Sequence, residues 1–190
     1  MPLTTLDPGT ALIVIDLQEG IVNGNFIHPI GDIIGRTRAL IDVFRAKNLP
    51  VVLVNVAGRS PGRTEQGPRS SPSFSEGWTD LLPQLDQQSS DIAVTKRSWG
   101  AFATTDLEGQ LKARGVTQVA MSGVATSGGV EATARQAYEQ GFNVTLALDA
   151  MTDLRGEAHE YSVRNVFPRL GETGSTQEII SLLERRSAAL

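Results

Sequence analysis

The chain has 190 residues, of which 40% are hydrophobic and 20% charged, and its formal net charge is −4. These values are typical of one globular domain of ordinary size, and they give no basic footprint for nucleic acid. No apolar run approaches the roughly 20 residues that span a bilayer, and nothing near the first residue resembles a signal peptide. We therefore expect one domain over residues 1–190, located in the cytoplasm, without a nucleic-acid or membrane partner.

The sequence contains no cysteine. This absence excludes disulfides, thiolate metal sites and a cysteine nucleophile.

The first half of the chain alternates apolar runs with a helical segment. Residues 11–15 are a short continuous apolar run, typical of a strand buried on both faces of a sheet, and residues 51–56 predict a second buried strand rich in β-branched residues. Residues 33–47 between them have a helical composition, and Asn48-Leu49-Pro50 closes that helix. A strand, a helix and a strand at this spacing predict a βαβ unit with a right-handed crossover.

Residues 57–76 differ in character, because Gly, Ser, Pro and Arg dominate there. Arg59, Arg63 and Arg69 lie in this stretch. A loop of this length inside a compact domain is often a lid or a binding loop. A solvated, mobile excursion is equally compatible with the composition.

The second half continues the alternation, with three further strands and four further helices. We expect the strands at residues 91–95, 118–122 and 144–148, and the helices at residues 105–114, 132–140, 156–166 and 177–186. Alternating strands and helices predict an α/β fold: a single-domain, doubly wound, mostly parallel sheet of five or six strands with helices on both faces. In such sheets ligands bind beyond the carboxyl ends of the strands.

Two charged residues follow predicted strands at that edge. Asp16 comes directly after the first strand, where apolar neighbours raise a carboxyl pKa and suit it to general acid chemistry. An aspartate that caps the next turn is the structural alternative. Lys96 ends the third strand and offers a fixed positive charge for a substrate carboxylate or a developing enolate oxygen. A solvated lysine is the alternative there.

The stretch from Gly123 to Ala134 is where the fourth strand turns into a helix. Ser127 is a possible N-cap, and a helix N-terminus offers free N–H groups and a positive dipole end to a carboxylate or an oxyanion. The hydroxyls of Thr126 and Ser127 need an activating base, and the sequence shows no evident histidine partner. The expected substrate-binding residues of this stretch are Val124, Ala125, Thr126, Ser127 and Gly128.

Other candidates surround these positions. Gln18 faces the same side of an extended segment as the preceding aspartate, and is either a substrate contact or an ordinary loop glutamine. Arg97 either binds a carboxylate through two nitrogens or points into solvent. Trp78, Trp99 and Phe102 are expected to line the pocket or to belong to the core.

Three segments together resemble the motifs of the isochorismatase-like (cysteine hydrolase) family, in the same order and with the same spacing. They are Ala11-Leu12-Ile13-Val14-Ile15-Asp16-Leu17-Gln18, Thr95-Lys96-Arg97-Ser98-Trp99-Gly100-Ala101-Phe102 and Gly123 to Ala134. The resemblance covers nearly the whole chain. It implies that Asp16 and Lys96 match the catalytic aspartate and lysine, that Val124-Ala125 matches a frequent cis peptide, and that the protein is a homo-oligomer.

The resemblance also shows a departure. Cysteine-dependent amidohydrolases of the family carry their nucleophile immediately before a Val-x-x-Thr-Ala segment, and Gly129 stands at that place here. True isochorismatases are similar, because they have glycine there and keep the aspartate and the lysine. The resemblance therefore implies a hydrolase that acts on a small carboxylate-bearing substrate, a vinyl ether such as isochorismate, with catalytic Asp16, Lys96 and Gly129. An inactive ligand-binding or regulatory relative, and an amidohydrolase that uses water, remain open.

No metal and no cofactor are expected. The metal site of nicotinamidases would lie after the second strand, and residues 57–60 contain no histidine. His28 and His159 are the only histidines, and His159 is expected to be structural or solvated.

Overall fold

The computed structural model of the protein describes residues 3–65, 67–68 and 74–187. Its centre is a six-stranded sheet in which every neighbouring pair of strands is parallel. In spatial order the strands are β5 (Ile92–Lys96), β2 (Val51–Val56), β1 (Thr10–Ile15), β6 (Gln118–Val124), β7 (Asn143–Thr152) and β8 (Glu172–Gly174). The predicted single-domain, doubly wound parallel sheet is therefore confirmed.

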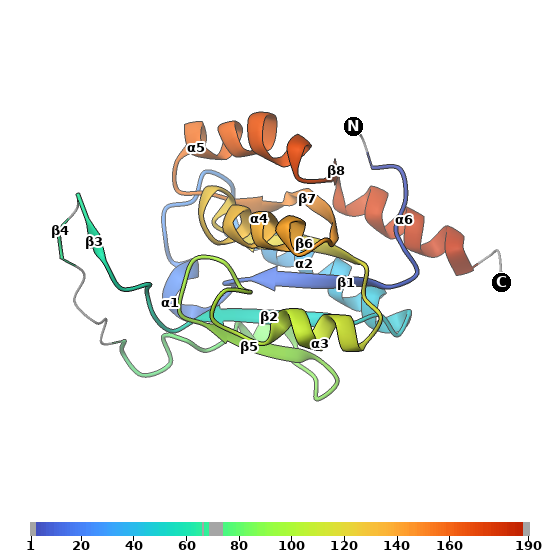
Figure 1. The fold of residues 1–190 in the computed structure, drawn as a ribbon, viewed down its shortest axis with the longest axis horizontal. Helices are drawn as coiled ribbons and strands as arrows, with labels where there is room; N and C mark the ends of the chain where they lie inside the picture. The colour runs from blue at the N-terminus through green and yellow to red at the C-terminus, as the bar shows by residue number, and fades with distance from the viewer. Residues whose placement is uncertain (1–2, 66, 69–73, 188–190) are drawn as a thin grey trace.

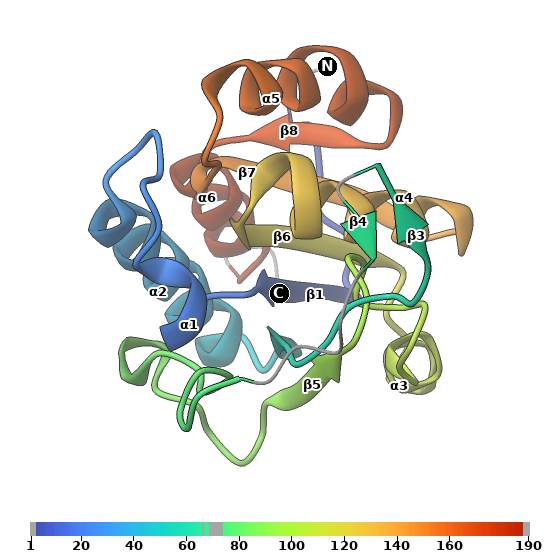
Figure 2. The same ribbon diagram turned by 90° about the vertical axis from the view of Figure 1, so that its left-hand side faces the viewer.

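Helices cover both faces of this sheet. They are α1 (Glu19–Val22), α2 (Ile30–Ala46), α3 (Leu107–Ala113), α4 (Glu131–Glu139), α5 (Gly156–Tyr161) and α6 (Thr176–Ser187), with the short turns η1 (Pro83–Leu85), η2 (Thr126–Val130), η3 (Ser162–Val166) and η4 (Phe167–Arg169). Seen along the sheet, α2 and α6 lie on one side, and α3 and α4 lie on the other (Figure 2). The chain termini lie at the end of the molecule away from the carboxyl end of β1 (Figure 1).

Several boundaries differ from the sequence-based expectation. The helix expected from residue 105 begins at Leu107, and the one expected over 156–166 changes to a wider turn after Tyr161. β7 continues past residue 148 to Thr152, because after a bulge its last residues pair with the end of β6. The short elements α1 and β8 were not predicted, since four and three residues are too few for a periodic pattern.

The segment after β2 is the part of the chain that projects furthest from the body (Figure 1). It contains a small antiparallel ribbon of β3 (Arg63–Thr64) and β4 (Gly67–Pro68). Arg59 and Arg63 are exposed, and Arg69 lies outside the described residues.

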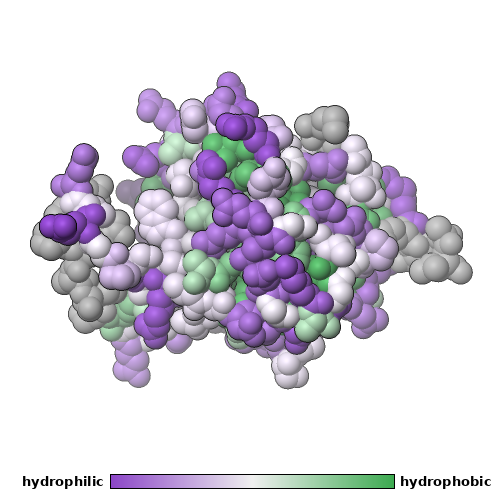
Figure 3. All heavy atoms as spheres, in the orientation of Figure 1, coloured by the Kyte–Doolittle hydropathy of each residue, from purple (hydrophilic) through white to green (hydrophobic). Residues whose placement is uncertain are grey.

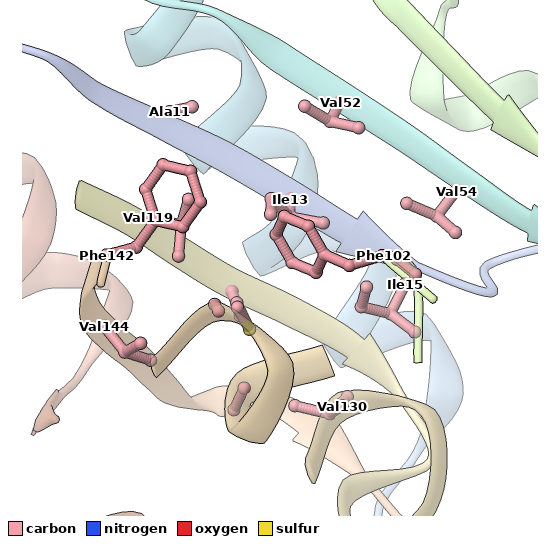
Figure 4. Close-up of a cluster of buried hydrophobic side chains, with 14 of the residues drawn as sticks. Ala11, Ile13, Ile15, Val52, Val54, Phe102, Val119, Val130, Phe142 and Val144 are labelled. Carbon is pink, nitrogen blue, oxygen red and sulfur yellow. The ribbon is translucent and has the colours of Figure 1, made fainter. Parts of the chain in front are cut away.

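The core consists of two hydrophobic clusters, one on each face of the sheet. β1 supplies both, because its side chains alternate: Ile13 and Ile15 belong to the cluster under α3 and α4, and Leu12 and Val14 to the cluster under α2 and α6. Figure 4 shows the first cluster, with Phe102 beside Ile13 and Ile15. β1 is thus buried on both sides, as its uninterrupted apolar sequence predicted.

The outer surface over α3 and α4 is mostly hydrophilic or intermediate in hydropathy, with hydrophobic residues in small separate areas (Figure 3). Within the described ranges, no helix is both long enough and apolar enough to cross a membrane.

Candidate active site

The candidate site lies where the strand order reverses. From β1 the sheet continues to β2 and β5 on one side, and from β6 it continues to β7 and β8 on the other. Asp16 follows β1, and the η2 turn follows β6, so both lie at this switch point. The crevice beyond the carboxyl ends of the strands at a switch point is the usual ligand site of doubly wound sheets.

A buried ion pair occupies this point. Lys96 Nζ lies 2.7 Å from Asp16 Oδ2, although the two residues are 80 positions apart in sequence. The ammonium also donates to the carbonyl oxygen of Trp99 at 2.7 Å, which fixes its direction. Asp16 is 5% exposed and Lys96 is 1% exposed. The structure thus brings together the predicted general acid, Asp16, and the predicted fixed positive charge, Lys96.

The carboxyl group of Asp16 is not fully satisfied by this pair. Its Oδ1 is buried without a hydrogen-bond partner in the described part of the chain. Burial raises the pKa of the Asp16 carboxyl from its usual 3.8 to about 6, against the opposing charge and hydrogen bond of Lys96. A carboxyl group with such a pKa exchanges its proton near neutral pH, which suits a general acid or base.

The backbone of Asp16 has a positive φ of 53°. Among residues other than glycine, aspartate and asparagine tolerate this left-handed conformation best. Its N–H donates to Val54 O at 2.9 Å, which anchors the residue to the end of β2. An Asp16→Asn substitution therefore removes the charge without imposing a new backbone conformation.

Gly129 faces the ion pair. A Cβ atom built at Gly129 would lie 3.0 Å from Asp16 Oδ2, 3.0 Å from Ile15 Cγ2 and 3.3 Å from Lys96 Nζ. These distances are shorter than ordinary van der Waals contacts, so the pair approaches the turn as closely as a residue without a side chain allows. The glycine predicted at the nucleophile position is therefore next to Asp16 and Lys96.

The backbone between β6 and η2 contains the cis peptide bond that was expected there. The peptide between Val124 and Ala125 is cis, as the family resemblance implied. Val124 is buried, whereas Ala125, Ser127 and Gly128 are partly exposed above the ion pair.

Ser127 does not act as an N-cap, which corrects the prediction. It lies inside η2, and α4 begins only at Glu131, without a side-chain cap. Instead, the N–H and the hydroxyl of Ser127 both donate to Asp153 Oδ2, at 2.7 and 2.8 Å. A carboxylate of the chain itself thus occupies part of the position that the sequence assigned to a substrate anion.

Thr126 has a histidine partner, contrary to the expectation from the sequence. Its Oγ1 lies 2.9 Å from His159 Nδ1 on α5. Both residues are buried, with Thr126 fully inaccessible. The pairing makes His159 structural, one of the two alternatives considered. A fully buried hydroxyl cannot attack a substrate, so Thr126 is not placed as a nucleophile.

Gln18 lies in a different environment from the one predicted. It is completely buried; Nε2 donates to Val56 O and to Trp78 O, and Oε1 accepts from Val56 N. Both amide protons are thereby engaged, so the side chain has no donor left for a substrate. Gln18 connects the end of β1 to the end of β2 and to the 78–82 segment.

Arg97 points away from the ion pair. Successive residues of an extended segment alternate sides, and Lys96 is buried while Arg97 is exposed. Its Nη1 donates to Ala57 O at 3.0 Å, and the stem of its side chain packs over Gly58. The solvent-facing alternative describes its position better than a carboxylate contact in the crevice.

The aromatic candidates have three different environments. Phe102 is buried in the core, and Trp99 is 60% exposed although its carbonyl oxygen holds Lys96. Trp78 is half-buried, stacks on Phe74 with centroids 4.1 Å apart, and packs directly against Gly20. In the described residues, no group of three or more histidine, aspartate or glutamate side chains is arranged to hold a metal ion.

Sequence reasoning missed Asp153, which is 3% exposed and accepts from the Ser127 and Arg155 backbone N–H groups. Its position just after β7, at the same sheet edge as the other candidates, was the available signal. No comparable signal linked His159 to Thr126, because the contact depends on how α5 packs against η2.

The α/β fold, the position at the switch point of the sheet and the buried Asp16–Lys96 pair beside Gly129 define a candidate site without a side chain at the nucleophile position. Residues 10–178 match the isochorismatase domain model. The chain belongs to the isochorismatase family of hydrolases. It is 40% identical over 181 residues to the uncharacterised family protein YecD of Escherichia coli O157:H7, with 92% of this chain and 96% of that one covered.

One further relative is named only by its family, and another is named by an amidase activity. An isochorismatase family protein of Burkholderia thailandensis has a solved structure with a TM-score of 0.89 and 38% identity, covering 95% of this chain and 98% of that one. Nicotinamidase 3 of Arabidopsis thaliana is 30% identical over 164 residues, covering 82% of this chain and 79% of that protein. Since the family includes amidases, membership alone does not favour ether over amide hydrolysis.

Proposed function

We propose that the protein is a metal-independent hydrolase that cleaves a small, carboxylate-bearing vinyl ether, with Asp16 as general acid and Lys96 as electrostatic stabiliser. The observation that carries the proposal is the buried Asp16–Lys96 pair against Gly129, where no side chain is present to act as a nucleophile. An acid group and water are the reactants that this arrangement offers to a substrate.

Vinyl ether hydrolysis needs only these two. The proton of Asp16 adds to the terminal carbon of the enol ether, which turns its CH₂ group into CH₃ and leaves an oxocarbenium ion. Water adds to the cationic carbon and gives a proton back to the Asp16 carboxylate. The resulting hemiketal breaks its bond to the ether oxygen, which releases an alcohol and a 2-keto acid, pyruvate when the substrate is isochorismate.

Lys96 contributes to this sequence through its fixed charge. Its ammonium is held by Asp16 and by the Trp99 carbonyl oxygen, so it is oriented before substrate binds. A preorganised charge in a site shielded from water stabilises an anionic group more strongly than the same charge in solvent. The substrate carboxylate is the group we expect it to hold.

Amide hydrolysis is the second candidate, because nicotinamidase 3 is among the relatives. It is the weaker candidate here because Gly129 supplies no side-chain nucleophile beside Asp16 and Lys96, and the Thr126 hydroxyl, although paired with His159, is completely buried. A ligand-binding protein without catalysis is the remaining possibility from a different class.

The test is pyruvate release from isochorismate, coupled to lactate dehydrogenase, for the wild type and the Asp16→Asn variant. Asp91→Asn is the matched control: Asp91 also forms a buried ion pair, with Arg45 at 2.5 Å, on the segment that leads into β5. We expect turnover in the wild type and the control, and a loss of about 10²–10⁴-fold in Asp16→Asn, the range of general acid catalysis. Unchanged turnover in Asp16→Asn would contradict the assignment, and turnover of a small amide alone would favour the second candidate.

A further inference from the structure

The contact between Thr126 and His159 connects the candidate site to an element outside it. Thr126 is the first residue of η2, three positions before Gly129, and its hydroxyl is 2.9 Å from His159 Nδ1 on α5. Asp16 Oδ2 lies only 3.0 Å from where a Cβ atom of Gly129 would be. A shift of η2 by a few tenths of an ångström would therefore change the contact between Gly129 and the Asp16–Lys96 pair.

His159 is in turn held by a second imidazole. The rings of His28 and His159 are edge to face, with centroids 5.1 Å apart. The backbone N–H of His28 donates to Thr152 Oγ1 at 3.2 Å, and His28 Nδ1 lies 3.1 Å from the same hydroxyl oxygen. The two histidines thus link the end of β7, the segment before α2, α5 and η2.

The electrostatic surroundings favour an uncharged His159. Burial lowers the pKa of His159, and the neighbouring His28 lowers it further. Glu160 on the same helix and Asp153 at the end of β7 oppose this effect. Thr126 is the neutral group that η2 presents to the ring.

We propose that His159 is a positioning residue, which holds the η2 turn through Thr126 so that Gly129 stays against the Asp16–Lys96 pair. Asp153 provides the second attachment of the same turn through Ser127. The consequence for turnover rests on the proposed function; the consequence for the geometry of Asp16 does not.

The experiment compares Thr126→Val with Thr145→Val. Both substitutions remove a completely buried threonine hydroxyl that has a 2.9 Å hydrogen-bond contact. Thr145 lies in the first half of β7 and accepts from Gln118 at the start of β6, so it does not contact the η2 turn. Thr126→Ser keeps the hydroxyl, and His159→Asn keeps a polar atom near the position of Nδ1. The measurements are the Asp16 pKa, from NMR of carboxyl-labelled aspartate, and kcat and KM for isochorismate.

We expect Thr126→Val to shift the Asp16 pKa toward 3.8 by at least about half a unit, because a displaced turn admits water to the carboxyl group. We expect kcat to fall about tenfold to a hundredfold with KM nearly unchanged, as for a small misplacement of reacting groups. The single variants Thr126→Ser and His159→Asn should keep most of the wild-type Asp16 pKa and kcat. Thr145→Val should change neither value, despite a similar loss of thermal stability.

The outcomes separate the two proposals. A shifted Asp16 pKa in Thr126→Val, with no isochorismate turnover in the wild type, supports the positioning role and contradicts isochorismate as the substrate of the proposed function. Wild-type turnover with identical pKa and kcat values in Thr126→Val and Thr145→Val overturns the positioning role and leaves the proposed function standing.

Discussion

At the scale of single residues, the site is governed by what burial does to one carboxyl group. Asp16 lies under the η2 turn with one oxygen on Lys96 and the other without a hydrogen bond in the described structure. The desolvation of the carboxylate exceeds the stabilisation by the neighbouring ammonium, and the pKa rises to about 6. This balance keeps a proton available close to neutral pH.

The raised pKa predicts a pH dependence of stability. The folded protein binds the Asp16 proton more tightly than the unfolded chain does, so this contribution is fully present below about pH 4 and is lost as the pH rises through about 6. The wild type should lose on the order of 2–3 kcal/mol relative to Asp16→Asn between pH 4 and pH 7, at about 1.4 kcal/mol per pKa unit. Urea unfolding of both proteins at several pH values measures the difference.

The same proton should limit catalysis. If Asp16 is the general acid, kcat/KM falls about tenfold per pH unit above its pKa, because the free enzyme must hold the proton. A rate that is flat from pH 5 to pH 8 would contradict that role.

At the scale of elements, the site depends on connections between strand ends. The strands pair up to their ends, for example Val56 with Lys96, and beyond these ends individual side chains make the connections. Gln18 is the clearest case, since its amide holds Val56 at the end of β2 and the carbonyl oxygen of Trp78.

The Gln18→Leu variant tests this structural role. The substitution removes the acceptor of the Val56 N–H and one donor each from the carbonyl oxygens of Val56 and Trp78, of which Trp78 O still accepts from the Gly20 N–H. We therefore expect a loss of about 1–3 kcal/mol in unfolding free energy. Hydrogen exchange in the 78–82 segment should become faster, and chemical denaturation gives the free energy. A variant with normal stability and a raised KM would instead restore the predicted substrate contact.

At the scale of the whole molecule, both hydrophobic clusters share the strands of one sheet. Phe44 of α2 is completely buried on one face, and Leu111 of α3 is completely buried on the other. Because β1 contributes to both clusters, the two faces should unfold together, as in a single cooperative domain.

Truncating a core side chain on either face of the sheet should therefore lower the midpoint temperature of one shared unfolding transition. We expect Phe44→Ala to cost about 3–5 kcal/mol and Leu111→Ala about 2–5 kcal/mol, the usual range for emptied core positions. Calorimetry should show one transition in each variant, shifted to lower temperature. Two separate transitions, with only one affected by each substitution, would contradict the single cooperative unit.

The sequence by itself determined the parallel α/β architecture, five of the six strands in the sheet and the candidate pair of Asp16 and Lys96. Buried parallel strands appear as continuous apolar runs, and a charged residue at the end of such a run must lie at the carboxyl edge. That reasoning placed Asp16 and Lys96 together, and the absence of cysteine limited the chemistry before any geometry was known.

Only the tertiary structure decided the roles of the polar residues around the pair. Gln18, Arg97 and Ser127 were candidates for substrate contacts, yet their side chains bind the chain's own backbone or Asp153. The partners are 26 to 60 residues distant in sequence, and a local pattern does not encode which distant carbonyl or carboxylate will satisfy a buried donor. The pairing of Thr126 with His159 was decided in the same way, by the packing of α5 against the η2 turn.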